Sequence, residues 1–196
     1  MSRTIFYGAA FAAFASASLL TLTAITIPRW VSYTYETSSG PITQTYGLHH
    51  SCRTTPTFTT CTPFPSAPDC LDSPHFCSLW HSTNYLMNLA ISIELLTTLA
   101  FLFTIFGSPS SRKHGWRYLI ILLVLCVTCQ LLAMSLVSYV YENDERFFVG
   151  WRLDVCWVLC TFSWGVILVV TGLVGLVGWV LPEEGRAGEG GYERLQ

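Results

Sequence analysis

The chain has 196 residues, of which 52% are hydrophobic and only 11% are charged, and its formal net charge is −2. Its mean hydropathy is +0.47. Because soluble domains carry about a quarter of their residues as charged side chains, lipid is the expected solvent for much of this surface. The slight negative charge offers no basic face to neutralise phosphates, which excludes nucleic acid as an expected partner.

Four apolar stretches are long enough to cross a bilayer as helices, which takes about 20 residues each. They cover residues 4–27, 85–106, 116–141 and 155–181. Tryptophan and tyrosine residues near most of their ends match the aromatic belts of the two lipid–water interfaces. A signal peptide is the alternative for the first stretch, because Arg3 precedes it and Ala15-Ser16-Ala17 resembles a cleavage site. Its apolar run continues to Ile27, which favours a retained helix.

The first loop, residues 28–84, contains the signals for β-structure. Residues 30–35 and 42–46 are rich in β-forming side chains, and the Ser-Ser-Gly-Pro sequence between them is a turn signal. We therefore expect a β-hairpin, followed by an irregular Thr/Pro-rich section over residues 53–68. In the short last loop, residues 142–154, we expect Phe147-Phe148-Val149 to add an edge strand to this hairpin.

Charge and cysteine placement predict the orientation of the four spans. Arg112 and Lys113 lie in the short loop 107–115, and Lys and Arg prefer the cytoplasmic side. The long first loop holds four closely spaced cysteines, which suits disulfides in an oxidising compartment. They are Cys52, Cys61, Cys70 and Cys77, and their number allows three pairings. We expect this loop outside the cell or in a lumen, and both termini in the cytoplasm.

The chain ends in a Gly- and Glu-rich tail, residues 182–196, which we expect to be disordered. Tyr192 and Leu195 form a Tyr-x-x-apolar pattern of the kind that sorting adaptors bind. Patterns this short recur by chance, so a solvated tail is the favoured interpretation.

Several residues of the first loop occur in a specific order, namely Trp30, Gly47, Leu48, Cys52 and Cys61. With the four-span plan and the long first loop, they resemble the claudin superfamily. That group includes claudins, peripheral-myelin-protein relatives, channel auxiliary subunits and fungal cortex proteins. The resemblance implies one membrane domain over residues 1–181, an all-α four-helix bundle with a small extracellular antiparallel β-sheet. It also implies a Cys52–Cys61 disulfide between adjacent strands, and Cys70 would then pair with Cys77.

Three features depart from the family pattern. His49 stands where the family has Trp, and Cys70 with Cys77 makes an extra cysteine pair. The final Leu195-Gln196 differs from the Tyr-Val ending that claudins offer to PDZ scaffolds. These departures weaken a tight-junction role, and the extra cysteines resemble the fungal claudin-like branch.

Two polar residues are predicted at similar depth inside the membrane, Glu94 in the second span and Gln130 in the third. An intramembrane carboxylate is a functional-site candidate by default. We favour a structural role, in which a protonated Glu94 joins helices by hydrogen bonding to Gln130, Ser16 or Ser18.

Cys126 and Cys129 form a Cys-x-x-Cys pattern in the third span, which would suit a membrane thiol oxidoreductase. Deep apolar surroundings make thiols inert, so packing is favoured for both and for Cys160, and less firmly for Cys156 near the outer interface. The loop histidines lack the short ligand spacings of zinc sites, so we expect no metal. These histidines are His49, His50, His75 and His81.

The sequence contains no catalytic set, so we expect neither enzymatic activity nor a cofactor or small-molecule substrate. The expected function is that of an integral plasma-membrane protein that organises membrane domains, cell adhesion or the cell cortex through its disulfide-bound outer loop. Its partners would be the bilayer, other membrane proteins or copies of itself. The alternative is an auxiliary subunit that modulates a channel, transporter or receptor.

Overall fold

The computed structural model describes residues 3–38, 40–107 and 109–180. Its elements follow the order helix, four strands, three helices, short strand, helix. The tail over residues 182–196, with Tyr192 and Leu195, lies outside the described residues. Its expected disorder and its sorting pattern therefore stay predictions.

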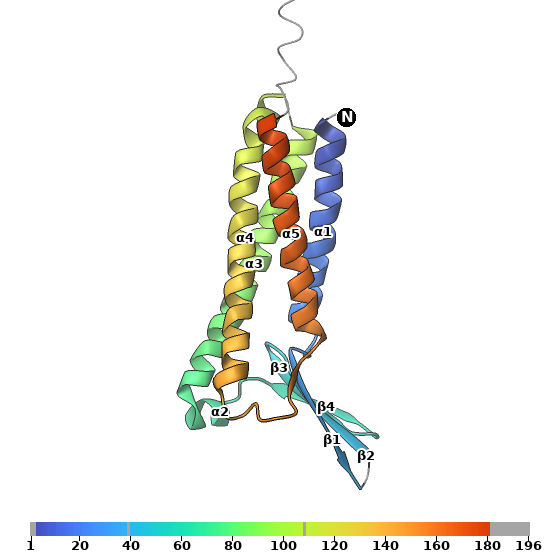
Figure 1. Ribbon diagram of the computed structural model, residues 1–196, viewed down its shortest axis with the longest axis vertical. Helices are drawn as coiled ribbons and strands as arrows, with labels where there is room; N and C mark the ends of the chain where they lie inside the picture. Colours follow the sequence, from blue (N-terminus) through green and yellow to red (C-terminus); the bar gives the residue numbers. More distant parts are fainter. Residues whose placement is uncertain (1–2, 39, 108, 181–196) are drawn as a thin grey trace, which may run out of the picture.

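Within the described residues, four long helices form a bundle (Figure 1). They are α1 (Arg3–Thr26), α3 (Pro74–Phe106), α4 (Pro109–Asn143) and α5 (Val155–Val180). Contacts join α1 to α3, α3 to α4, α4 to α5 and α5 to α1, so the helices close into a ring. Each is long and apolar enough to cross a membrane. Because a helix satisfies its own backbone hydrogen bonds, this is the architecture of a multi-pass membrane protein.

Two helices begin earlier than their apolar stretches predict. α3 begins at Pro74 instead of residue 85, which shortens the predicted loop 28–84. Proline suits the first helical position, and Phe76 and Trp80 in the added turns are buried. α4 begins at Pro109, so most of the predicted loop 107–115 is helical. Polar residues in these first turns, which hydropathy assigns to loops, explain both differences.

A five-stranded antiparallel sheet lies at one end of the bundle, which we call the sheet end (Figure 1). Its strands are β1 (Val31–Thr37), β2 (Gly40–Tyr46), β3 (His50–Thr54), β4 (Thr59–Pro63) and β5 (Arg152–Leu153). Their order across the sheet is β4-β3-β2-β1-β5. The predicted hairpin is the β1–β2 pair, in which Val31 faces Tyr46 and Thr37 faces Gly40.

The predicted irregular section over residues 53–68 is instead partly ordered. β3 and β4 form a second hairpin there, and α2 (Ala67–Asp72) follows it. β-branched threonines favour an extended backbone, and Pro63 is tolerated because it ends an edge strand. Turn-forming prolines and the hydroxyl-rich composition explain why the sequence pattern did not predict this hairpin.

The predicted edge strand is also displaced, because the residues that pair with β1 are Arg152 and Leu153 and not 147–149. Phe147 is packed edge-on against Trp151, with ring centroids 5.5 Å apart. Gly150 then turns the chain with a φ of +114°, a conformation that favours glycine. Residues 147–149 therefore form a turn that the contact between Phe147 and Trp151 holds in place.

Two apolar cores fill the bundle. The core at the sheet end includes Trp30, Leu48 and Trp80, and the core at the far end includes Phe14 and Phe101. Along each helix, a buried polar residue separates the residues of the two cores. These are Thr21 in α1, Glu94 in α3, Gln130 in α4 and Ser163 in α5.

Candidate functional site

Trp30 connects the sheet to two helices. Its fully buried ring donates a hydrogen bond from Nε1 to the carbonyl oxygen of Ala24 in α1, at 2.8 Å. Its backbone N–H donates to the Tyr46 carbonyl at 2.8 Å, and its own carbonyl accepts from the Asp154 N–H at 2.9 Å. The residue therefore fixes β1 against both the end of α1 and the start of α5.

Gly47 and Leu48 form the tight connection between β2 and β3. A Cβ atom at Gly47 would lie 2.4 Å from the Cα of Pro28, so only glycine fits beside this backbone. Leu48 is fully buried in the sheet-end core. His49, at the position of the family's Trp, has its Nδ1 3.1 Å from Nδ2 of Asn84 in α3. The connection thus anchors the sheet to α1 and α3.

Both disulfides lie at the sheet end. Cys52 and Cys61 are direct cross-strand partners in β3 and β4, with their Cα atoms 4.1 Å apart. Cys70 of α2 is bonded to Cys77 of α3, with a Cα separation of 5.2 Å. These are the pairings that the family resemblance implies. His81 Nδ1 or Nε2 lies within 4.8 Å of the second pair, but disulfide sulfurs are not the thiolates that zinc binds.

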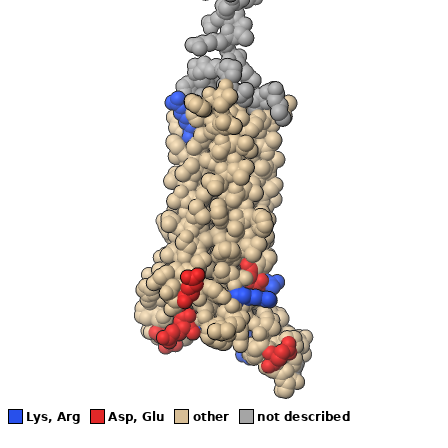
Figure 2. All heavy atoms as spheres, in the orientation of Figure 1, with Lys and Arg blue, Asp and Glu red and all other residues tan. Residues whose placement is uncertain are grey.

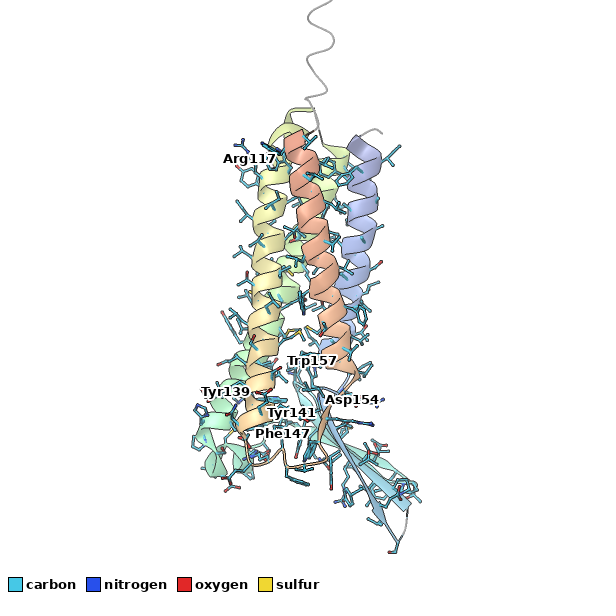
Figure 3. All side chains as sticks on the ribbon, in the orientation of Figure 1. Arg117, Tyr139, Tyr141, Phe147, Asp154 and Trp157 are labelled. Atoms are coloured by element: carbon cyan, nitrogen blue, oxygen red, sulfur yellow. A yellow bond between two sulfur atoms is a disulfide. The ribbon has the colours of Figure 1, made fainter. Side chains whose placement is uncertain are left out.

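Stacked aromatic rings fill the space between the sheet and the ends of α3 and α4. Tyr46 lies between Phe64 and Trp151, with ring centroids 4.6 and 5.1 Å from its own. Phe64 in turn contacts Trp80 edge-on at 5.3 Å. The hydroxyl of Tyr141, near the end of α4, donates to the Trp151 carbonyl at 2.7 Å (Figure 3). Such pairs favour a fixed arrangement of the sheet on the bundle.

Arg146 links α2 to the segment that follows α4. Its Nη1 lies 3.2 Å from Oδ1 of Asp69, its Nη2 donates to the Asp69 carbonyl at 2.8 Å, and its guanidinium lies 4.4 Å from the ring centroid of Phe76. Burial disfavours the charged form of Asp69. Hydrogen bonds from Ser66 and the charge of Arg146 outweigh that burial and hold the pKa of Asp69 below its ordinary value.

The β4 edge of the sheet is open along its whole length. β4 is the terminal strand, and all five of its residues are exposed. Exposed apolar side chains near the sheet end include Phe58 in the turn before β4, Leu71 in α2 and Val149, which is 99% exposed. Figure 2 shows acidic and basic residues gathered at this end, below a long belt of uncharged surface on the face in view. The sheet end is therefore the polar, solvent-accessible face, and β4 is a free edge on it.

The four buried polar side chains meet inside the bundle. Nε2 of Gln130 donates to Oε1 of Glu94 at 2.7 Å and to the hydroxyl of Thr21 at 3.1 Å. The Thr21 and Ser163 hydroxyls are 2.6 Å apart, and Ser163 also donates to the Ala17 carbonyl of α1 at 2.9 Å. The chain of hydrogen bonds thus joins all four long helices.

The predicted contact between Glu94 and Gln130 is present in this network. Ser18, a second candidate partner, has its buried hydroxyl beside the Glu94 carboxyl. Ser16, the third, is exposed and bonds within its own helix, to the carbonyl of Ala12. Sequence reasoning missed Thr21 and Ser163. Their only sequence signal is a hydroxyl residue near the middle of an apolar span.

The remaining cysteines are free and buried within the bundle, and they are Cys126, Cys129, Cys156 and Cys160. Cys126 Sγ lies 3.6 Å from Oε1 of Glu94, and Cys156 Sγ lies 3.2 Å from the carbonyl oxygen of Ile27. The Cys-x-x-Cys pattern of α4 is therefore unbridged in this structure, with Cys126 at the rim of the polar network.

A scan against protein-family models finds no match to this chain, and a search of the curated proteins finds none either.

Proposed function

We propose that this protein is a non-enzymatic, claudin-like four-span membrane protein whose sheet serves as a contact surface. The observation that carries the proposal is β4, a fully exposed edge strand held by the Cys52–Cys61 disulfide. Its partners would be other membrane proteins or further copies of the chain. The processes that this surface would serve are the organisation of membrane domains, cell adhesion or the cell cortex.

An open edge strand offers a row of backbone N–H and C=O groups to another chain. Proteins usually protect such edges with charged side chains, bulges or covering segments. β4 carries neither lysine nor arginine, and its one protective residue is the terminal Pro63. The disulfide also fixes this strand before any partner arrives, which lowers the entropic cost of binding. Phe58, 62% exposed in the adjoining turn, would add apolar contact.

The family resemblance supports the same role. Trp30, Gly47 and Leu48 act as the anchor between sheet and bundle, which is a physical reason for a family pattern at these positions. Disulfides of this kind need an oxidising compartment, which favours an extracellular sheet, cytoplasmic termini and a plasma-membrane location. The departures at His49 and the Cys70–Cys77 pair favour a branch of the superfamily other than the junction claudins.

Photo-cross-linking in intact membranes tests the proposal. A photoreactive amino acid replaces Thr60, which is exposed in the middle of β4. The matched control carries it at Ser78, an exposed position on α3 at the same end of the molecule. We expect a discrete protein adduct from Thr60 and none at comparable yield from Ser78, because only the first lies on a free strand edge.

The identity of the adduct distinguishes the candidate roles. Multiples of the chain's own mass would support self-assembly. One different membrane protein at a fixed ratio would favour the auxiliary-subunit alternative. Equal yields from the two positions, or no protein adduct at Thr60, would contradict a contact surface at β4.

A further inference from the structure

The segment that forms β3, β4 and the turn between them is rich in hydroxyl side chains and in proline. Of the 16 residues 51–66, eight are serine or threonine and three are proline. This composition is typical of chains that carry O-linked sugars. Composition alone does not identify an acceptor, but the structure distinguishes the eight hydroxyls by their exposure and their hydrogen bonds.

Thr60 is the residue of this segment whose hydroxyl is left free. The other seven hydroxyls each lie within hydrogen-bond distance of a second group in this segment or in α2. They belong to Ser51, Thr54, Thr55, Thr57, Thr59, Thr62 and Ser66. Thr60 is exposed in the middle of β4, and its hydroxyl has no hydrogen-bond partner among the residues that the structure describes. Its oxygen and its proton are therefore both available to an enzyme.

Thr60 also lines an open groove on one face of the sheet, with a volume of about 660 Å³. Gln44, Arg53 and Thr60 lie side by side across β2, β3 and β4, because Gln44 pairs with Arg53 and Arg53 pairs with Thr60. The ring of Phe58, in the turn before β4, lines the same groove. The volume lies in the range of small-molecule sites, about 300–1,000 Å³.

The groove wall carries groups that bind the hydroxyls of a sugar. The amide of Gln44 both donates and accepts hydrogen bonds, and the guanidinium of Arg53 donates several. Arg53 Nη2 donates to the Tyr35 hydroxyl at 3.0 Å, which holds the guanidinium over the sheet. The exposed ring of Phe58 would cover the C–H face of a sugar and remove apolar surface from water. A sugar bonded to Thr60 needs little affinity of its own, because its attachment keeps it at a high effective concentration in the groove.

We propose that Thr60 is O-glycosylated in the secretory pathway and that its first sugar lies in this groove. Oγ1 of Thr60 attacks C1 of a sugar that is activated as a phosphate ester, which a glycosyltransferase of that pathway binds. The bond between C1 and the phosphate oxygen breaks, the phosphate leaves with the electron pair, and the hydroxyl proton passes to a base of the enzyme. This inference rests on the extracellular or lumenal sheet that the proposed function includes.

The sugar would stand on the face of the sheet and leave the β4 edge free for a partner. Side chains of a strand point away from the plane of the sheet, whereas the backbone N–H and C=O groups of its edge lie in that plane. The sheet projects beyond the end of the bundle, so a transferase reaches β4 without meeting the helices (Figure 1). Glycosylation of Thr60 and pairing at the edge therefore use different directions.

Site-resolved mass spectrometry of the full-length chain, purified from the membranes of eukaryotic cells, tests the attachment. We expect a mass gain of at least one hexose or N-acetylhexosamine, and fragment ions that keep the sugar should place it on Thr60. Thr60→Val removes the acceptor and should abolish the gain, whereas Thr60→Ser should retain it. The matched control is Thr59→Val, at the adjacent exposed position of β4, whose side chain lies on the opposite face. This variant should carry the sugar like the wild type.

Removal of the sugar from the folded protein by an exoglycosidase tests its place in the groove. Gln44→Met removes the amide but not the acceptor, so cleavage should become about fivefold faster, the equivalent of one net hydrogen bond. Thr43→Val changes the neighbouring position of β2 on the opposite face and should leave the rate unchanged. Equal rates in the two variants would overturn the placement in the groove.

The absence of sugar on Thr60, or sugar on other residues of the segment in its place, would overturn the proposal. A parallel Thr57→Asn variant separates this failure from a failure of the proposed function, because it creates an N-glycan acceptor in the turn before β4. An N-glycan at residue 57 with no sugar on Thr60 of the wild type would contradict O-glycosylation alone. The absence of both would contradict the orientation on which the proposed function also depends.

Discussion

Gly47 illustrates how one backbone position fixes the sheet on the bundle. A Cβ atom there would lie 2.4 Å from Pro28 Cα, and a backbone atom cannot move aside as a flexible side chain can. The Gly47 N–H also donates to the His50 carbonyl at 2.8 Å, which closes the turn into β3. The sequence pattern identified this glycine, and the steric reason for it lies in a residue from another segment.

Gly47→Ala should therefore lower the free energy of unfolding by about 1–3 kcal/mol, the usual cost of overpacking. Thermal unfolding in detergent measures the effect, with Gly165→Ala as the control. A Cβ at Gly165 meets no atom within 4 Å, so that variant should match the wild type or exceed it slightly. Equal stability of the two variants would show that the Pro28 contact relaxes freely.

Substitutions at Glu94 and Gln130 test whether their hydrogen bond has a structural role. Glu94→Gln keeps a carbonyl acceptor for Nε2 of Gln130, so we expect the helices to stay joined and the stability to change little. Gln130→Leu removes the donor to both Glu94 and Thr21 and should destabilise the bundle by about 0.5–2 kcal/mol. Thermal unfolding compares the two. A Glu94→Gln variant that stays stable but loses its cross-linked partner would contradict the structural role and assign the carboxyl a functional one.

Among the elements, the two hairpins differ in how readily the sequence predicts them. β1 and β2 contain tyrosine, valine and isoleucine on either side of the Ser-Ser-Gly-Pro turn signal, whose Gly40 and Pro41 begin β2, and this local pattern predicts them. β4 has five exposed residues and no apolar alternation, so its place in the sheet depends on pairing with β3. Phe147 likewise fits the residue pattern of a strand, but contacts with the rings of Tyr141 and Trp151 hold it in a turn.

The short helix α2 depends on long-range anchoring to Arg146, which makes its stability sensitive to pH. The pKa of Asp69 is lower in the folded state, so its contribution is complete above the unfolded value of about 4 and is lost as the pH falls through the lower folded value. The thermal midpoint should therefore differ most between the wild type and Asp69→Asn near pH 7, and the two should converge in strong acid. A difference that is independent of pH would contradict the ion pair with Arg146.

At the scale of the whole molecule, the four candidate membrane helices place the sheet at the end of the bundle opposite to the start of α1 and the end of α5. The chain has no Asn-x-Ser/Thr acceptor, so an introduced one reports topology cleanly. Thr57→Asn creates an Asn-Phe-Thr acceptor in the turn before β4 and should be glycosylated in the secretory pathway. Pro109→Asn creates Asn-Ser-Ser between the second and third spans and should not be. Glycosylation of each variant is measured as a gel-mobility shift that glycosidase treatment removes. Glycosylation at residue 109 and not at residue 57 would contradict the proposed orientation.

The sequence by itself determined the four apolar spans, the β1–β2 hairpin and the cysteine-rich loop, because hydropathy and turn chemistry are local and each membrane helix must satisfy its own backbone. Only the tertiary structure decided which side chains meet. Thr21 and Ser163 join Glu94 and Gln130 through the relative rotation of four helices, and the free edge at β4 follows from strand order. Packing between distant segments decides both the polar network and the free edge, and no sequence pattern within one segment encodes that packing.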